Sequence, residues 1–365
     1  MPSQKILVVF QPWRKISGSL HQQLTDGLKS LGYDVDYLDT ENPPPFQNKN
    51  LTDKFRNIYE RLVHRNKLYS LIAHKNHVNR FYRKKIAQLP KDKMYDLVLI
   101  IKPEEYTTQN IEKLSRLGNK TVGYIWDGLR LFFKPSLVKS LKYLDGVYSF
   151  DIDNIADHPD LDMKFLTNYY IPDIPSTPFD SRKTDVFYVG SLAGTLDTQR
   201  RDWKLAELAK FLSGNIDISI FAERGFLNND HRLVDSTKIK YITSPTSIED
   251  TLEKTKNSKI VIDICKKHHI GLSFRFFECM LYETKIITNN ADVVNYDFYN
   301  PDNILVVDFD NIEKYKDKIL DFQKKPYKQI PEEIKTKYSL DNWIKILLNA
   351  PGSNPIVHKN HLEKK

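Results

Sequence analysis

The chain is poor in the features that mark several large protein classes. It has only two cysteines, Cys265 and Cys279, in 365 residues, and they show no CxxC spacing. Two thiols cannot staple a fold of this size, so disulfide scaffolds are excluded and a reducing compartment is expected. The longest apolar runs, at 5–10 and 97–101, are of strand length, so no signal-peptide core or membrane span is expected. The expected location is the cytoplasm, with peripheral contact on the inner face of the membrane as an option.

Motifs of the common nucleotide-binding and metal-binding classes are also missing. No GxGxxG follows a predicted strand and no GxxxxGK[ST] loop occurs, which disfavours dehydrogenases and P-loop kinases. The D-x-D triplets at 151–153 and 160–162 are of the kind that hold a divalent ion under a diphosphate. Such short acidic patterns are frequent by chance, so we expect no metal site and no required cofactor.

Short apolar runs alternate with amphipathic segments through most of the sequence. The predicted strands are 5–10, 33–39, 96–101, 121–126, 146–150, 185–190, 217–222, 239–243, 259–264, 285–288 and 304–309. Helix-like segments separate most of these strands, as in parallel sheets that are covered by helices on both faces. The fold class is therefore α/β, with two Rossmann-like domains that are expected to face each other across a cleft.

A proline-rich stretch separates the two runs of alternation. Residues 170–184 read YIPDIPSTPFDSRKT, and three prolines forbid regular structure there. This pattern predicts an N-terminal acceptor domain, a linker, a nucleotide-sugar domain that ends in a helix at 339–350, and a polar, mobile tail. Their predicted bounds are 1–171, 172–184, 185–350 and 351–365.

Positive charge is concentrated in one part of the chain. The formal net charge is +8, and residues 49–93 contain 13 Lys or Arg against 3 acids. Apolar residues recur there at helical spacing, which predicts basic amphipathic helices. Their cationic face, with Arg80, Arg83, Lys84 and Lys85, would attract anionic lipid or an acidic glycan, unless it is simply a solvated face. Because no zinc-finger spacing, RNP-like motif or recognition helix is found, no nucleic acid is expected as a partner.

One turn–helix–strand unit, GLSFRFFECMLYETKIIT at 271–288, suggests a nucleotide site. Ser273 can cap the helix, and the free amides of Gly271, Leu272 and Ser273, with the helix dipole, favour a phosphate. Arg275 could fork onto phosphate oxygens, and Glu278, three residues later, could accept from ribose hydroxyls. The alternative is a surface i,i+3 ion pair on an ordinary helix.

A second phosphate candidate opens the C-terminal half, VGSLAGTLDTQRR at 189–201. Gly190 and Ser191 end a strand, and glycine lets the backbone approach a ligand closely. Arg200 and Arg201 enter the next helix and could neutralise a diphosphate. The alternative is a glycine-containing loop with a solvated arginine pair.

These motifs, in this order, resemble the donor-binding half of GT-B glycosyltransferases. The likeness is greatest to bacterial glycosyltransferases of lipopolysaccharide and capsule synthesis, in which GLSxRxxE, KxIT, WD and SFDxxD recur. The corresponding pieces here are GLSFRFFE, KIIT, Trp126-Asp127 and SFDIDN. The resemblance covers residues 95–310 loosely and is specific mainly at 257–300.

The resemblance implies a role for each matched residue. Glu278 would bind the ribose. Phosphate would be bound by the 271–273 turn and by the Gly190–Ser191 loop with Arg200 and Arg201. Tyr241 would lie near the base of the nucleotide. The chain departs from the pattern at two positions. Ile270 stands where many retaining members carry a glutamate eight residues before the ribose glutamate, and Asn154 stands where an aspartate is frequent.

The expected activity is transfer of a sugar from a nucleotide-diphosphate donor, a UDP-sugar first, to a surface glycan or glycolipid. Inverting transfer needs a base near the acceptor hydroxyl, and Asp127 and His21 are the candidates. Each has another explanation, since Asp127 can cap a helix and His21 can be a solvated helix residue. Two other functions stay open, which are a non-catalytic scaffold on the same fold and a sugar-nucleotide epimerase.

Overall fold

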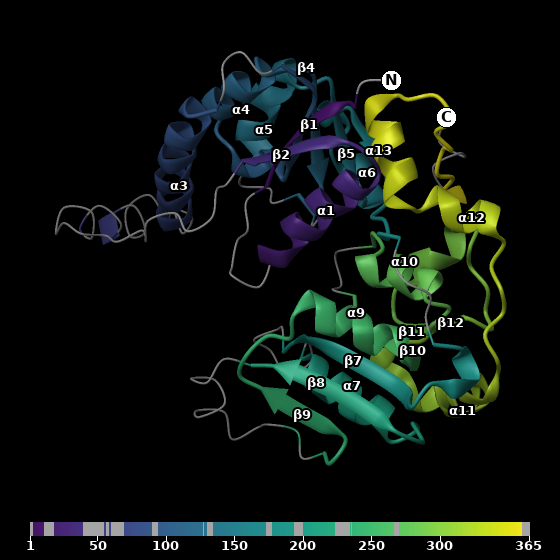
Figure 1. Ribbon diagram of the computed structural model, residues 1–365. Coiled ribbons are helices and arrows are strands. Elements are labelled where there is room, and N and C mark those ends of the chain that lie inside the picture. The colour runs from purple at the N-terminus through teal and green to yellow at the C-terminus, as the bar shows by residue number, and fades with distance from the viewer. Residues whose placement is uncertain are drawn as a thin grey trace. The chain divides into compact units, whose positions relative to one another are not determined.

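The computed structural model describes residues 3–10, 18–38, 55, 58–59, 69–89, 94–126, 128–129, 134–172, 177–192, 200–222, 234, 236–265 and 270–359. The chain divides into two compact units (Figure 1). The N-terminal unit comprises Met1–Leu166 and Leu347–Ala350, and the C-terminal unit comprises Thr167–Ile346 and Pro351–Lys365. The division at Leu166 precedes the predicted linker.

The N-terminal unit is built on a parallel sheet. Its described strands lie in the order β2-β1-β3-β4-β5-β6, and every neighbouring pair is parallel. The bounds are β1 Lys5–Val9, β2 Asp34–Leu38, β3 Tyr95–Ile101, β4 Gly118–Ile125, β5 Gly146–Ser149 and β6 Met163–Phe165. The strand order reverses between β1 and β3. Sheets of this kind bind ligands beyond the carboxyl ends of the strands at such a switch point.

Helices lie on both faces of this sheet. They are α1 Gly18–Ser30, α3 Tyr69–Ala87, α4 Thr108–Ser115, α5 Lys134–Ser140 and α6 Ile152–Asp157, with short 3-10 turns η2 Pro103–Glu105, η4 Leu141–Tyr143 and η5 Pro159–Leu161. Figure 1 shows α3, α4 and α5 grouped on one side and α1 and α6 on the other. The helix α3 is the described part of the predicted basic segment.

Alternation along the strands explains why α3 and α4 pack where they do. Leu7 and Val9 of β1 and Val98 and Ile100 of β3 point to the same face and are fully buried. They meet the apolar side of α3, with Val78, Tyr82 and Ile86, and that of α4, with Ile111 and Leu114. Because Ile6, Val8, Leu97 and Leu99 are also fully buried, both faces of the central strands are covered, as parallel sheets require.

The C-terminal unit repeats the architecture. Its described strands lie in the order β12-β11-β10-β7-β8-β9, again all parallel. The bounds are β7 Thr184–Ser191, β8 Ile216–Phe221, β9 Ile239–Ile242, β10 Ser258–Asp263, β11 Lys285–Thr288 and β12 Ile304–Val306. The strand order reverses between β7 and β10. The switch point of this unit therefore lies at the carboxyl ends of those two strands.

The helices of this unit follow the predicted pattern. They are α7 Arg201–Ala209, α9 Ile248–Lys256, α10 Phe274–Leu281, α11 Lys316–Lys324, α12 Glu332–Lys337 and α13 Leu340–Leu348, with 3-10 turns η6 Phe179–Ser181, η8 Ala291–Asn295 and η9 Phe309–Tyr315. Side chains from α7, η9 and α11 pack on one face of the sheet. The predicted strands are all present in the described chain, and β6 is a strand that the sequence pattern did not predict.

The polar tail is packed along part of its length. Asn342 of α13 donates from Nδ2 to the carbonyl of Asn354 at 2.8 Å. His358 is 1% exposed, and its Nε2 lies 3.0 Å from both carboxylate oxygens of Asp292. These contacts anchor the tail at Asn354 and His358, whereas most of the other residues from 351 to 359 are exposed. Residues 360–365 lie outside the described part of the chain.

Candidate functional site

The predicted phosphate turn lies where β10 ends and α10 begins. Ser273 has the extended backbone of a helix N-cap, but its hydroxyl donates to Oδ1 of Asp263 at 2.9 Å instead of accepting from the first helical amides. The prediction that its side chain caps α10 is therefore wrong. Leu272 is 1% exposed, and its carbonyl accepts from Nδ2 of Asn168 at 3.0 Å. Both contacts fix the turn to the body of the C-terminal unit.

Arg275 does not stand free at the start of α10. Its guanidinium donates to the carbonyl of Ile262 at 3.2 Å and to that of Val189 at 2.9 Å, and it lies 3.4 Å from Oδ1 of Asp263. It also lies over the ring of Tyr188, 5.7 Å from the centroid. The side chain therefore bridges the carboxyl ends of β10 and β7 and is held at the switch point.

Arg201 approaches the same place from α7. Its guanidinium donates to the carbonyl of Ser191 at 3.3 Å and to that of Ile264 at 3.2 Å. It also hydrogen-bonds the side chain of Tyr188, so that Arg201 and Arg275 both interact with this tyrosine. Two guanidinium groups thus meet at the β7–β10 switch point, which is a strongly anion-attracting arrangement.

Arg200, the other predicted arginine, faces inward. It is 2% exposed and forms a bidentate ion pair with Asp202, with distances of 2.6 and 3.1 Å. Asp202 also accepts from the hydroxyl of Tyr241 at 2.8 Å. Arg200 and Tyr241 therefore belong to a buried network that fixes the start of α7 against β9.

Gly190 is required by a close approach within β7. A Cβ atom at this position would lie 2.5 Å from the hydroxyl oxygen of Tyr188. Side chains essentially never come so close, so any other residue would displace Tyr188. Since Tyr188 contacts both arginines, Gly190 preserves the geometry of the switch point. Ser191 follows it and is exposed.

Glu278 lies on α10, three residues beyond Arg275. It is partly buried, and no described residue donates a hydrogen bond to its carboxylate. Loss of hydration raises the pKa of Glu278 to about 7, against the lowering effect of Arg275. A carboxylate that accepts no hydrogen bond from the described residues, near the guanidinium of Arg275, is suited to accept hydrogen bonds from ligand hydroxyls.

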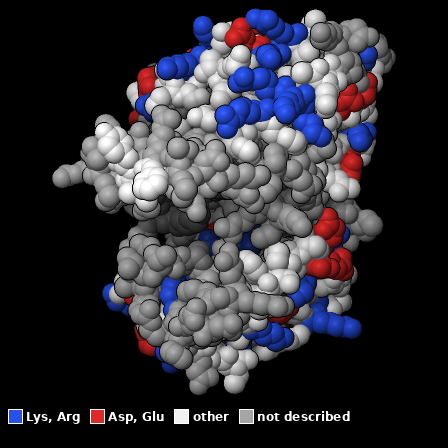
Figure 2. All heavy atoms as spheres, turned by 90° about the vertical axis from the view of Figure 1, so that its left-hand side faces the viewer, with Lys and Arg blue, Asp and Glu red and all other residues white. Residues whose placement is uncertain are grey.

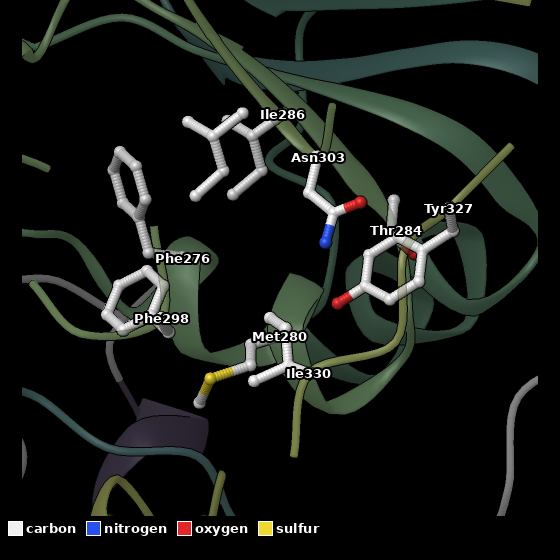
Figure 3. A pocket seen from close by; sticks show the side chains of 9 residues that line it. Phe276, Met280, Thr284, Ile286, Phe298, Asn303, Tyr327 and Ile330 are labelled. Atoms are coloured by element: carbon white, nitrogen blue, oxygen red, sulfur yellow. The ribbon is translucent and has the colours of Figure 1, made fainter. Parts of the chain in front are cut away.

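A cavity on another side of α10 is too small to hold a nucleotide (Figure 3). Phe276 and Met280 of α10 line it together with Asn303 and Tyr327, and its volume is about 10 Å³. This is room for roughly one water molecule, whereas ligand pockets measure about 300–1,000 Å³. This cavity is therefore no candidate for a nucleotide site.

In the N-terminal unit, aromatic side chains gather near the carboxyl end of β1. His21 of α1 stacks on Tyr37 of β2, with ring centroids 4.3 Å apart and an interplanar angle of 15°. Phe10 follows β1 and contacts Trp126, which follows β4, edge to face at 4.7 Å. His21 is thus brought near the carboxyl edge of the sheet. Asp127, the other predicted base, lies outside the described residues.

The turn after β3 contains ionisable residues that the sequence reasoning missed. Lys102, Glu104 and Glu105 are 6%, 1% and 2% exposed, and they lie at the switch point of the N-terminal unit. The available signal was the run KPEE directly after a buried strand, since the carboxyl ends of parallel strands carry functional residues.

The described part of the basic segment presents unpaired cations. Arg80 and Lys84 of α3 are exposed and Arg83 is partly exposed, and none of the three has an acidic partner among the described residues. Lys85 lies over the ring of Phe81 at 5.6 Å. Figure 2 shows Lys and Arg gathered on the N-terminal unit, on the side from which α3 projects. The helix contains no Asp or Glu.

Two searches of the described residues give negative results. No group of three or more His, Cys, Asp or Glu side chains with the geometry of a metal site occurs among them. No described helix combines the length and apolar character needed to cross a membrane.

Sequence comparisons find no match, whereas structural comparisons find proteins of similar fold. No protein-family model matches the chain. No curated protein matches it either. An α-glucosyltransferase solved with UDP and a 13-mer DNA containing an HMU base superposes with a TM-score of 0.57 at 10% identity, covering 95% of this chain and 100% of that one.

Two further structures give similar values. A glycosyltransferase from Rickettsia africae ESF-5 has a TM-score of 0.52 at 14% identity, covering 96% of this chain and 97% of its own. Anabaena Alr3699/HepE in complex with UDP-glucose has a TM-score of 0.50 at 10% identity, covering 94% of this chain and 98% of its own. Identities this low establish the fold alone.

The exclusion of nucleic acid was wrong. Two structures of this fold contain DNA, one the 13-mer complex and the other an α-glucosyltransferase with UDP-glucose and DNA containing an abasic site. The missing recognition motifs therefore do not exclude a nucleic-acid partner for this architecture. The predicted fold class is confirmed, because two parallel α/β sheets, each covered by helices, form the two-domain fold of GT-B glycosyltransferases.

Proposed function

We propose that the protein is a glycosyltransferase that binds a UDP-sugar in its C-terminal unit. The observation that carries this proposal is the pair Arg201 and Arg275 at the β7–β10 switch point. Glu278 lies on the same helix as Arg275, and its carboxylate accepts no hydrogen bond from the described residues. Anion-binding guanidinium groups, an aromatic ring and a carboxylate that can accept from hydroxyls lie close together at this switch point. The solved structures of this fold that hold UDP or UDP-glucose support the same donor class.

Each group has a role in this proposal. Arg201 and Arg275 each use part of their five N–H donors on strand carbonyls, so other donors are left for diphosphate oxygens. Glu278 accepts from the ribose hydroxyls. The turn at 271–273 and the Gly190–Ser191 loop bring main-chain groups close to the phosphates.

A thermal-shift screen tests the donor site. UDP at 100 times its Kd is expected to add roughly 2.7 kcal/mol to the stability of the protein, a readable rise in Tm. GDP, CMP and the matching sugar nucleotides are run in parallel. The rise should disappear in the Arg275→Gln and Glu278→Ala variants and persist in Arg116→Gln, a surface control on the other unit. If no nucleotide shifts the wild type, the transferase proposal fails and a non-catalytic scaffold is favoured.

The affinity for UDP is expected to depend on pH through Glu278. Because burial raises its pKa to about 7, part of the protein carries a neutral Glu278 below that pH, and only the ionised form accepts both ribose hydroxyls. Affinity should therefore rise as pH increases toward 7 and level off above it, by at most about tenfold per pH unit. Calorimetric titration from pH 5.5 to 8.5 measures this.

A matched variant distinguishes the titration of Glu278 from that of UDP itself. The terminal phosphate of UDP itself titrates near about pH 6, so part of the dependence belongs to UDP. Glu278→Gln should retain the pH dependence that comes from UDP and lose the pH dependence that comes from Glu278. Identical pH profiles for the wild type and the variant would contradict the assignment of Glu278.

The acceptor hydroxyl and its base are proposed to lie on the N-terminal unit. His21 is a candidate base, since its ring is oriented by the stack on Tyr37 and lies near the end of β1. Asp127 is the other. The surface glycan or glycolipid of lipopolysaccharide-type synthesis is the acceptor class suggested by the sequence motifs, and the cations of α3 would bind its anionic groups.

A specific observation favours a second acceptor class. Arg80 and Lys84 lie one helical turn apart on α3 and have no acidic partner among the described residues, which suits successive phosphates of a nucleic acid. Structures of this fold are known with DNA. Transfer from radiolabelled UDP-glucose to duplex DNA or to a delipidated glycan fraction discriminates the two. Product formed without any acceptor would instead indicate an epimerase.

A further inference from the structure

The turn after β3 carries the most unusual backbone of the N-terminal unit. Lys102, the first residue beyond the strand, has φ 57° and ψ 59°, in the left-handed region. Glycine adopts this conformation without strain, whereas other residues are held there at a cost of about 1–3 kcal/mol. Strained positions of this kind cluster at functional sites, so this turn is a candidate for one.

The side chains of this turn form a buried charged cluster. Nζ of Lys102 lies 3.8 Å from Oε1 of Glu105, a loose ion pair with side chains 8% and 2% exposed. Glu104 is 1% exposed, and its Oε2 atom has no hydrogen-bond partner among the described residues. Unsatisfied buried carboxylate oxygens are rare and mark strained or functional sites.

The same turn anchors the basic helix. Lys75 of α3 donates from Nζ to the carbonyl of Glu104 at 2.6 Å, and Asn79 donates from Nδ2 to the carbonyl of Glu105 at 2.9 Å. Asn79 also accepts from the amide of Thr107 at 2.8 Å. The cations on the outer side of α3 are thus fixed to the turn that contains Lys102, and their field favours anions nearby.

We propose that Lys102 binds a phosphate group of the acceptor, and that Glu105 is the counter-charge which Lys102 exchanges for that phosphate. The proposal rests on the proposed function and assigns the acceptor a chemical class. Lys102 stands at the β1–β3 switch point, where open α/β sheets take their ligands. Phe10, which ends β1, packs against Trp126, so an aromatic surface adjoins the carboxyl end of the neighbouring strand.

Phosphate fits this site better than a single-charged group. Lys102 and Lys75 bring two cations into the cluster, and burial keeps Glu104 protonated at neutral pH, since its pKa is raised to about 8. Among these four side chains, positive charge is therefore in excess when Glu105 is the ionised acid. A phosphate monoester carries up to two charges, and it can accept from an ammonium group while Glu104 donates its proton to a further oxygen.

The test is a thermal-shift titration with glycerol 3-phosphate in the presence of saturating UDP, with glycerol as the uncharged control. Wild type should gain Tm with glycerol 3-phosphate and not with glycerol. Lys102→Gln, which keeps a side chain in the left-handed conformation, should weaken the apparent affinity about tenfold or more, as for a lost charged hydrogen bond. Lys139→Gln, at an exposed position of α5 that has no role in the proposed site, is the matched control and should bind normally.

Further arms keep the test decisive. Lys102→Gly removes the charge and the backbone strain together, so it should fold even if Lys102→Gln does not, and it should also lose binding. Sedimentation with vesicles of phosphatidic acid in phosphatidylcholine, against phosphatidylcholine alone, distinguishes a lipid phosphate from a soluble one. Equal glycerol 3-phosphate affinity in wild type and both Lys102 variants, or no shift in any of them, would overturn the proposal.

Failure of the proposed UDP site can be distinguished from failure of the proposed Lys102 site. If UDP itself does not bind, the glycerol 3-phosphate titration is repeated in an Arg201→Gln/Arg275→Gln variant, which removes the other anion-attracting pair. Loss of the Lys102-dependent shift in that background assigns the phosphate to the C-terminal unit and overturns the Lys102 site, whereas its persistence supports the site independently of UDP.

Discussion

Replacing Asp202 by asparagine is expected to lower the free energy of unfolding by about 3–5 kcal/mol, the usual effect of breaking a buried ion pair. Asp202 is fully buried and its only charged partner among the described residues, Arg200, is 2% exposed. The amide removes the carboxylate charge that faces the buried guanidinium, and it also weakens the bond from Tyr241. Urea denaturation followed by tryptophan fluorescence measures the loss.

The control is an exposed ion pair of the same unit. Asp217 and Lys254 are 2.7 Å apart with side chains 25% and 44% exposed, so Asp217→Asn should change stability by at most about 1 kcal/mol. The double variant Arg200→Met/Asp202→Leu removes both charges and should recover most of the stability lost in Asp202→Asn. Equal losses in Asp202→Asn and Asp217→Asn would contradict the interpretation of a buried charge pair.

The fold could be predicted because most strands correspond to distinct short apolar runs in the sequence. In a parallel sheet covered on both faces, strands contain continuous apolar runs such as 97–101 and 260–262, and these runs are distinct from the amphipathic helices between them. Strand β6 was not predicted because its three residues, Met163–Phe165, are too few to show an apolar run or an alternating pattern. The boundary after Leu166 lies before the predicted linker, because the linker was predicted from its prolines whereas the boundary is set by packing.

The candidate site was predicted in its location but not in its contacts. Sequence spacing places Arg275 and Glu278 near the switch point, yet it cannot tell which of two adjacent arginines turns inward. Arg200 pairs with Asp202 two residues later, and Tyr241, about forty residues away, completes the network, so the choice depends on tertiary packing. Likewise, Ser273 bonds Asp263 across the turn because the strand end lies beside it.

The turn at Lys102 was missed for a related reason. A left-handed lysine leaves no sequence mark, since glycine is the residue by which such turns are usually recognised. Two consecutive glutamates also read as a solvated loop by composition. Their burial follows from α3, whose Lys75 and Asn79 cover the turn. Long-range packing of this kind cannot be derived from local spacing.

Replacing Glu104 by glutamine is expected to stabilise the protein at pH 8, by up to a few kcal/mol, and to change little at pH 4.5. Burial, helped by Glu105, raises the pKa of Glu104 to about 8, while Lys102 and Lys75 lower it only in part. Below about pH 4.5 both the folded and the unfolded states hold the proton. Between pH 4.5 and 8 the unfolded state releases it and the folded state does not, so wild-type stability falls by up to about 1.4 kcal/mol per pH unit.

Glutamine imitates the protonated carboxyl and removes this loss. The difference in unfolding free energy between Glu104→Gln and wild type should therefore grow as the pH rises from 4.5 to 8. Measurements stop near pH 8 because the pKa of Lys75 is itself lowered to about 8 by burial, and its deprotonation acts with the opposite sign above that value. Glu112→Gln on α4, whose partner Arg116 is exposed, serves as the surface control.

The outcome also bears on the phosphate site. A neutral Glu104 is what gives the Lys102 cluster its excess positive charge and a proton to donate, so a pH-dependent gain in Glu104→Gln supports the electrostatics that the site requires. If Glu104→Gln and wild type keep a constant difference from pH 4.5 to 8, Glu104 is ionised throughout. The cluster would then be close to neutral, and a dianionic phosphate would have no electrostatic advantage there over a single-charged group.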